Sequence, residues 1–532
     1  MKKSVIRILM AVVLAFSAVM MSSVPVSAKV SIPDKVRIGL YFEDTAQSRF
    51  NVGAQKGLQF GSFVNGTFSV LFEDPSNNTY TVLKDSPAPY HILLYNSLQD
   101  YNNANMKAQA AKQAGIEAYP VFSDTWQVWT GNYIDTASAS AAIAAIQQKL
   151  GAGIYSVVNP SALRIAVQNS SGSTVLMFNS AVSALQIYPR AENSPNVFSI
   201  NSSRYRGGLE VRRFTDSDMT IINVIPLEEY LYGVVPNEIQ GSSNIEALKA
   251  QAVVARSYAI RNLNKHSSQK FDLCPTTYCQ MYRGYNTEYP ATNKAVDDSK
   301  GLIVTYNGEV AETLYCASSG GPTEDSKNVW GSTVPYLVSV DNKYELTTSG
   351  HYYWQESFTP SQIKTIMFKY GYDLGDITGI SIVERTPAGR VNKLLIQGTK
   401  DSKTLTKEST RDMLGLDSRM YEITSGSGAV TTSFSVSNGS SLSNVSLQGK
   451  TVITANGLKQ ISSNTGLTIL GANGTNKIGV STGNATTAKF VFTGKGWGHA
   501  LGMTQEGARG MALAGFKFDQ ILTHYYPGTV VE

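Results

Sequence analysis

The order of predicted elements between residues 90 and 155 constrains the fold of this chain more than any other feature. The segment begins with the apolar run YHILLYNSL and continues with an Ala-rich stretch that ends at Gly115. Two strand-like runs and a second Ala-rich stretch, which ends at Gly151, follow. Ala favours helices and a glycine after the last turn ends them. The pattern therefore predicts the order β-α-β-β-α, which makes a small split α/β sandwich.

Strand-like sequence surrounds this segment. The runs VRIGLYFED (36–44) and TFSVLFED (67–74) alternate apolar and polar residues, and the pattern returns from about residue 160 to 225. About 500 residues are too many for one hydrophobic core. We therefore predict a multidomain α+β protein with a β-rich region at 29–89, the sandwich at 90–155 and a strand-rich α+β domain at 156–532.

Residues 425–490 form a distinct segment inside that last domain. The segment lacks Asp and Glu, and its Val, Ile, Leu and Thr residues alternate between Asn-Gly turns. Such alternation predicts short antiparallel strands and hairpins. We interpret the segment as a β insertion, and a flexible surface excursion is the alternative.

The first 28 residues have the features of a secretory signal peptide. Lys2, Lys3 and Arg7 precede an apolar run, and Val26-Ser27-Ala28 is a small-residue cleavage pattern. The apolar run is about 14 residues long, whereas a membrane span needs about 20. We expect a secreted, extracytoplasmic protein, with membrane attachment only if the segment is retained. Its removal lowers the formal net charge from +5 to +2, which gives no support to nucleic acid as a partner.

A clear helix is predicted after residue 243. SNIEALKAQAVVARSYAIRNL starts with Ser243 and Glu246 at capping-box spacing. Its apolar residues recur at helical spacing and should face the core. Lys249 and Arg256 then fall on other sides of the helix, where they could reach a cleft.

Several glycine-rich and acidic stretches accompany that helix. They are VIPLEEYLYGVVPNEIQ (224–240), ETLYCASSGGPTED (312–325) and GKGWGHALGMTQEG (494–507). The last is not a dinucleotide-binding loop, because that needs a βαβ unit and an acidic residue about 20 residues further on. Together with FDLCPTTYCQMY (271–282), these stretches resemble the SpoIID/LytB family in order and in letters, over residues 190–532.

The resemblance implies a lytic transglycosylase that cuts peptidoglycan between N-acetylmuramic acid and N-acetylglucosamine without water. The catalytic glutamate of the family falls on Glu238. When the sugar's own C6 hydroxyl attacks, one carboxyl group can serve as both acid and base, unlike the carboxylate pair of ordinary glycosidases. Such an acid needs apolar surroundings that raise its pKa. The alternative for Glu238 is a surface carboxylate ahead of a helix, and Glu228 and Glu229 are the nearest rivals.

The resemblance also implies residues that bind the substrate. Ser318 and Ser319 precede paired glycines and should present their backbone to the glycan. Lys495, Trp497, His499 and Gln505 should line a sugar cleft, although Trp497 and His499 could equally be packed in the core. A cysteine hydrolase built on Cys316 and His499 is a weaker interpretation.

Two of the three cysteines lie in FDLCPTTYCQMY. Some relatives bind zinc with one His and two Cys in this stretch, which here implies His266, Cys274 and Cys279. Thiolate and imidazole are ligands that zinc favours. A Cys274–Cys279 disulfide is the competing interpretation outside the cell. The proposed reaction needs no cofactor, so a zinc ion would be structural.

The segment 90–155 resembles a SPOR domain, a family that binds peptide-free glycan. Trp126, Trp129 and Tyr133 could stack on sugars, although aromatic residues in strands are more often core residues. Two other functions stay open. One is a non-catalytic wall-binding modifier of an amidase, as in LytB-type relatives, and the other is a structural wall scaffold. The family name suggests a role in sporulation.

Overall fold

The computed structural model describes residues 31–85, 88–190, 195–214, 217–426 and 489–532, together with six short strands between 434 and 478. The predicted signal peptide, residues 1–28, lies outside the described residues. No helix in the described part of the chain has the length and apolar character that a bilayer crossing needs. The chain divides into two compact units, which are treated separately: residues 1–241, 252–312 and 528–532 form unit 1, and 242–251 and 313–527 form unit 2.

Two sheets dominate unit 1. The first has the order β1 (Lys35–Tyr41), β16 (Met219–Pro226), β15 (Gly208–Arg213), β12 (Leu185–Pro189), β3 (Leu58–Val64) and β4 (Thr67–Glu73). The second has the order β14 (Ser203–Arg206), β13 (Val197–Ile200), β2 (Arg49–Ala54), β5 (Thr79–Lys84), β10 (Ile165–Gln168), β11 (Thr174–Phe178), β7 (Ala118–Phe122), β8 (Trp126–Tyr133), β6 (Tyr90–Leu98) and β9 (Ser156–Val158). The strands predicted at 36–44 and 67–74 are confirmed as β1 and β4.

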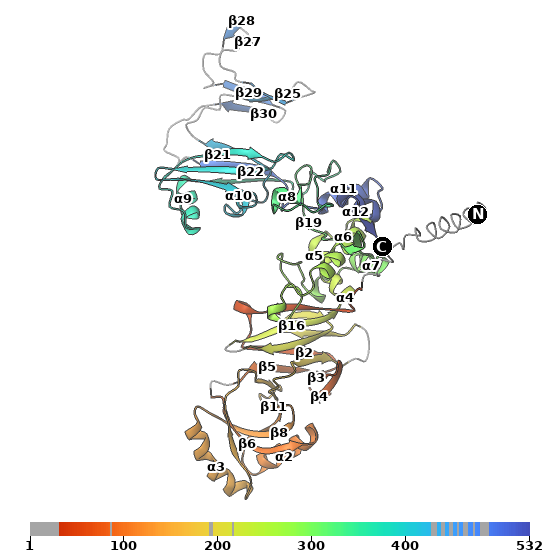
Figure 1. The fold of residues 1–532 in the computed structure, drawn as a ribbon, viewed down its shortest axis with the longest axis vertical. Helices are drawn as coiled ribbons and strands as arrows, with labels where there is room; N and C mark the ends of the chain where they lie inside the picture. The colour runs from red at the N-terminus through yellow and green to blue at the C-terminus, as the bar shows by residue number, and fades with distance from the viewer. Residues whose placement is uncertain are drawn as a thin grey trace, which may run out of the picture. The chain divides into compact units, whose positions relative to one another are not determined.

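The predicted β-α-β-β-α order is confirmed. It consists of β6, helix α2 (Tyr101–Gln113), β7, β8 and helix α3 (Thr136–Leu150) (Figure 1). Asp100 and Asp135 cap the two helices, each accepting a hydrogen bond from the backbone N–H three residues on. The strands do not form a sheet of their own, because β7 pairs in parallel with β11 and so joins the larger sheet.

The aromatic residues of this segment lie in its core. Trp126 and Trp129 are 7% and 2% exposed, so the core alternative holds for both and neither indole faces solvent as a sugar-stacking surface. Trp129 packs beneath the Arg164 guanidinium, 4.9 Å from its ring centre. Tyr133 is half-buried.

The rest of unit 1 is mainly helical and follows directly from β16. It contains α4 (Leu227–Tyr232), α5 (Val235–Glu238), most of α6 (Ile245–Arg261), α7 (Pro290–Asp298), and the small sheet of β18 (Glu309–Val310), β17 (Val304–Tyr306) and β33 (Val530–Val531). Every residue of α6 from Gln251 to Ile260 is buried, which is more than a one-sided amphipathic helix requires.

Unit 2 is built around two three-stranded sheets and a helix. The sheets are β20 (Tyr353–Phe358), β31 (Lys489–Lys495), β24 (Tyr421–Gly426), and β21 (Ile377–Arg385), β22 (Val391–Gly398), β23 (Ser402–Thr406). Their core includes Ile363 and Met367 from α9 (Pro360–Lys369), Leu394 from β22 and Phe492 from β31. The unit also contains α8 (Ser326–Val329), α10 (Ser409–Asp412), α11 (Gln505–Leu513), α12 (Phe518–Tyr525), and the paired strands β19 (Tyr315–Cys316) and β32 (Met503–Thr504).

The predicted insertion at 425–490 contains antiparallel hairpins, as its pattern indicates. They pair β25 (Phe434–Ser437) with β26 (Leu442–Val445), β27 (Thr451–Thr454) with β28 (Gly457–Gln460), and β29 (Leu467–Gly471) with β30 (Gly474–Ile478). The remainder of the insertion lies outside the described residues.

Candidate functional site

The predicted site residues fall into two groups, one in each unit. Unit 1 holds Glu238, Arg256, His266, Cys274 and Cys279, and unit 2 holds Lys249, Ser318, Ser319, Lys495, Trp497, His499 and Gln505.

Glu238 is the last residue of α5, on the tight turn that follows α4. Its chain neighbours Val234 and Val235 are fully buried and Ile239 is 3% exposed. The glutamate itself is half-buried. Its Oε1 accepts a hydrogen bond of 2.8 Å from the backbone N–H of Met281, which orients the carboxyl group.

Asn237 holds the turn that carries Glu238. Its side-chain amide donates to the Gly233 carbonyl at 2.7 Å and to the Thr287 hydroxyl at 2.9 Å. Two connections from neighbouring segments therefore converge here, one at Asn237 and one at Glu238. The carboxyl group sits on a braced turn rather than on a loose surface loop.

His266, Cys274 and Cys279 come together as the zinc hypothesis requires. One ligand atom from each lies within 4.8 Å of the other two, and the His266 Nε2 is 3.4 Å from the Cys279 sulfur. The other ring nitrogen, Nδ1, is 3.1 Å from Gln269 Oε1, an arrangement that directs Nε2 toward the thiols.

Both cysteines of this cluster are free thiols in the structure, so it does not contain the alternative, a Cys274–Cys279 disulfide. A hydrogen bond from the Cys279 thiol lowers the pKa of Cys274 to about 5 and raises that of Cys279. One sulfur thus has thiolate character, which suits a metal ligand. The same stretch supplies the Met281 amide to Glu238, two residues after Cys279.

Arg256 is a correction to the prediction, because it does not reach a cleft. Its guanidinium is fully buried and binds both carboxylate oxygens of Glu228, at 2.9 and 2.6 Å. It also donates to the carbonyls of Leu302 and Val296. Glu228 is therefore structural, as expected. Burial raises the pKa of its neighbour Glu229, with a further contribution from Glu288.

The start of α6 also differs from the prediction. Asn244, not Ser243, accepts the hydrogen bond from the Glu246 N–H, at 2.9 Å, and the Ser243 hydroxyl has no partner among the described residues. The Glu246 carboxylate accepts from the Phe518 N–H and lies 3.8 Å from Lys249. Lys249 therefore neighbours the start of α12.

Ser318 and Ser319 are likewise corrected, because both are buried at 0% and 1% exposure. The Ser319 and Gly320 N–H groups donate to the two oxygens of Glu345, at 2.7 and 3.0 Å. Burial raises the pKa of that carboxyl. The backbone N–H groups that we expected to face a glycan thus donate hydrogen bonds to Glu345 inside unit 2.

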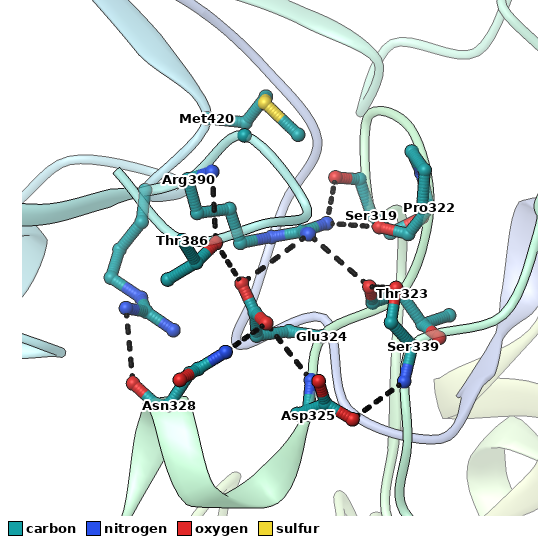
Figure 2. Close-up of polar contacts among 12 residues, drawn as sticks. Ser319, Pro322, Thr323, Glu324, Asp325, Asn328, Ser339, Thr386, Arg390 and Met420 are labelled. Atoms are coloured by element: carbon teal, nitrogen blue, oxygen red, sulfur yellow. Dashed lines mark hydrogen bonds and ion pairs between the residues drawn. The ribbon is translucent and has the colours of Figure 1, made fainter. Parts of the chain in front are cut away.

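An arginine closes this loop from the other side. Figure 2 shows the buried Arg390 guanidinium between Glu324 and the loop, with its Nη2 donating to the Ser319 and Pro322 carbonyls, each at 2.7 Å. Thr386 donates to Glu324 at 2.5 Å. This network could not be predicted from local sequence, because its members are far apart in the chain.

The GKGWGH motif separates into exposed and buried residues. Lys495 is exposed and Trp497 is 46% exposed, whereas Gly496 between them is buried. Gln505 is only 7% exposed and begins α11. Lys495 and Trp497 therefore remain candidates for contact with a ligand, and Gln505 has mainly a packed environment.

His499 and Cys316 do not form a nucleophile and base. The His499 Nδ1 accepts a hydrogen bond of 2.9 Å from the Leu501 N–H, and burial lowers its pKa to about 4. Burial raises the pKa of the Cys316 thiol to about 12. A protonated thiol and an engaged imidazole argue against the cysteine hydrolase.

Comparison with known proteins places these features in a family. Residues 215–306 match the SpoIID family, described as stage II sporulation protein. Residues 323–439 match a domain of unknown function (DUF8618).

Individual relatives agree with this match. An amidase enhancer of Bacillus subtilis (strain 168) is 32% identical over 355 residues, which are 65% of this chain and 47% of that protein. A stage II sporulation protein D of the same organism is 27% identical over 324 residues, 58% of this chain and 75% of the relative. An uncharacterized protein of Brachyspira hyodysenteriae is 26% identical, over 62% of this chain and 73% of that protein. The chain thus spans less than half of the amidase enhancer.

Proposed function

Because this chain belongs to the SpoIID/LytB family, we propose that it is a secreted lytic transglycosylase of peptidoglycan with Glu238 as its catalytic residue. The names of its relatives connect the family with sporulation and with an amidase. The substrate is the glycan strand, and the product is a 1,6-anhydromuramic end.

The geometry around Glu238 carries this proposal. The carboxyl group is oriented by the Met281 amide, and its chain neighbours Val234, Val235 and Ile239 are buried. In the reaction it protonates the oxygen that leaves with the departing sugar. The same group then takes the proton of the C6 hydroxyl as the C6 oxygen attacks C1. The reaction therefore needs no second carboxylate and consumes no water.

A matched pair of variants tests the assignment. Purified protein is incubated with peptide-free glycan strands, and 1,6-anhydromuramic ends are measured by mass spectrometry. Glu238→Gln should lower the rate at least a hundredfold. Glu229→Gln, which changes another half-buried glutamate of unit 1, should leave more than half of the activity. If product formation survives Glu238→Gln but is lost in Glu229→Gln, then Glu229 and not Glu238 is the catalytic residue.

The alternative is a wall-binding protein that stimulates an amidase without turnover. Its support is the relative named amidase enhancer. This function predicts binding to purified sacculi with no new glycan ends, and faster peptide release when an amidase is added. Anhydro ends produced by the protein alone would exclude it as the complete description.

We also propose that His266, Cys274 and Cys279 hold a zinc ion. The three ligand atoms within 4.8 Å and the orientation of His266 by Gln269 fit such a site. The ion would brace the stretch that supplies the Met281 amide. Metal analysis should find one zinc per chain in the native protein and almost none in His266→Ala. A protein without zinc that has only one reactive thiol after unfolding would support the disulfide instead.

A further inference from the structure

Exposed aromatic side chains gather in unit 2 where β20 begins and β31 ends. Tyr353 pairs with Lys495 across the two strands, and the Lys495 ammonium lies 5.7 Å from the Tyr353 ring centre. The His351 ring meets Trp497 edge to face, with their centres 5.1 Å apart. We call these four residues, His351, Tyr353, Lys495 and Trp497, the aromatic platform.

The platform side chains face away from the core of unit 2. Successive residues of a strand point to opposite faces, and the intervening Trp354 packs against the core with Phe492 and Tyr421. Tyr353 is 63% exposed and Trp497 is 46% exposed. Alternation along β20 thus places the Tyr353 ring on the solvent side, and Lys495 and Trp497 are exposed as well.

The backbone under the platform is held on several sides. Trp497 exchanges backbone hydrogen bonds of 2.8 and 3.2 Å with Ser318, and the Gly496 N–H donates to the Tyr352 carbonyl at 2.7 Å. The Lys495 N–H donates to Met420, and the Lys495 carbonyl accepts from Ser418. A Cβ on Gly496 would lie 2.6 Å from the Ser319 backbone, so only glycine allows this approach.

Within the described residues of unit 2, the platform side chains expose groups that the fold neither buries nor pairs with an opposite charge. The rings expose apolar surface that folding would favour burying, and no ion pair involves Lys495 among the residues that the structure describes. A well-braced backbone that displays two rings and a cation is preorganised for a ligand. The ligand should offer a flat apolar face and a negative charge at its edge.

We infer that the aromatic platform is a glycan subsite in which a sugar ring stacks on Trp497 or Tyr353 and Lys495 binds the lactyl carboxylate of a muramic acid residue. The inference rests on the proposed glycan substrate and assigns a role to part of the 323–439 segment, whose matching domain has no known function. Peptide-free muramic acid carries that carboxylate, whereas N-acetylglucosamine does not. The charge of Lys495 therefore favours strands that alternate the two sugars.

Binding measurements in a Glu238→Gln background test the inference without cleavage. The probes are soluble peptide-free glycan strands and chitotetraose, which has the same linkage but no carboxylate. Trp497→Ala and Tyr353→Ala should each weaken binding of both probes about tenfold. Lys495→Met should remove the preference for the carboxylate-bearing strands and leave chitotetraose binding unchanged.

Trp330→Ala is the matched control, because Trp330 is a 50% exposed tryptophan of the same unit outside the platform. Its binding should equal that of the parent, and thermal unfolding of each variant checks the fold. Equal binding by all four variants would overturn the inference. Binding of an added amidase that depends on Trp497, with glycan binding unchanged, would instead make the surface a protein-docking site and would also overturn it.

The outcomes separate this inference from the proposed reaction. If glycan binding depends on the platform but the wild-type protein forms no anhydro ends, the subsite stands and the transglycosylase proposal fails. If the wild-type protein cleaves strands and Trp497→Ala leaves KM and kcat unchanged, the reaction stands and the subsite fails.

Discussion

The turn around Glu238 in unit 1 and the GKGWGH strand end in unit 2 carry similar kinds of residues but use them differently. In unit 1, the charged side chains near the turn are largely engaged by the fold, as Arg256 is by Glu228. In unit 2, the glycines of the GKGWGH motif pack against buried backbone, whereas Lys495 and Trp497 are exposed to solvent. Burial and partners, rather than residue type, therefore distinguish residues that the fold engages from residues that stay accessible to a ligand.

The largest expected effect is a loss of stability on replacing Arg256 in unit 1. Arg256→Ala would leave the Glu228 carboxylate without its guanidinium and remove hydrogen bonds to Leu302 and Val296. Removing one partner of a buried pair costs about 3–5 kcal/mol of the free energy of unfolding, measured by urea denaturation.

A hydrophobic double replacement provides the control for that measurement. Arg256→Met with Glu228→Leu should recover part of the lost stability, since no charge is left unpaired. Unchanged stability in Arg256→Ala together with weaker glycan binding would contradict the structural role and make Arg256 a substrate-binding residue.

A pH effect of intermediate size is expected from His499 in unit 2. Burial lowers its pKa from 6.5 to about 4, so the unfolded chain takes up a proton at a higher pH than the native protein does. Its contribution to stability is complete above pH 6.5 and is lost as the pH falls toward 4, by up to about 3 kcal/mol.

Urea denaturation at pH 7 and pH 4.5 checks this effect. His499→Asn has no imidazole to protonate and should lose less stability than the wild-type protein over the same interval. Equal losses in the two proteins would show that His499 is accessible to protons in the native state and belongs with the exposed residues of the motif.

The smallest expected effects come from a comparison of buried Ser319 with exposed Trp497. Ser319→Ala removes a buried hydroxyl that accepts from Asn342 at 2.6 Å and should cost about 1–2 kcal/mol of stability. Trp497→Ala should change the free energy of unfolding by less than about 0.5 kcal/mol. Trp497→Ala should weaken glycan binding more than Ser319→Ala does. A larger loss of stability in Trp497→Ala than in Ser319→Ala would contradict the division into buried and exposed residues.

Local patterns predicted much of the fold. Apolar alternation located β1 and β4, Asn-Gly turns located the hairpins after residue 434, and Ala-rich runs ended by glycine located α2 and α3. The pairing of β7 with β11 was not predictable, because a long-range parallel contact leaves no local pattern. The sandwich strands therefore belong to a larger sheet than their order indicates.

Local pattern was less informative for the candidate site. It identified the cluster of His266, Cys274 and Cys279. It did not reveal that Glu228 engages Arg256 or that Glu345 engages the Ser319 amide, because both depend on tertiary contacts. The aromatic run HYYW at 351–354 was a signal for the platform, but only the register between β20 and β31 brings it to Lys495.

Cleavage in ¹⁸O-labelled water tests the proposal that Glu238 catalyses glycan cleavage without water. Wild-type protein should convert peptide-free strands into ends that carry no label and are lighter than hydrolysed ends by one water, and Glu238→Gln should not. Labelled reducing ends would show hydrolysis and contradict the mechanism. Unchanged strands would contradict the catalytic function altogether.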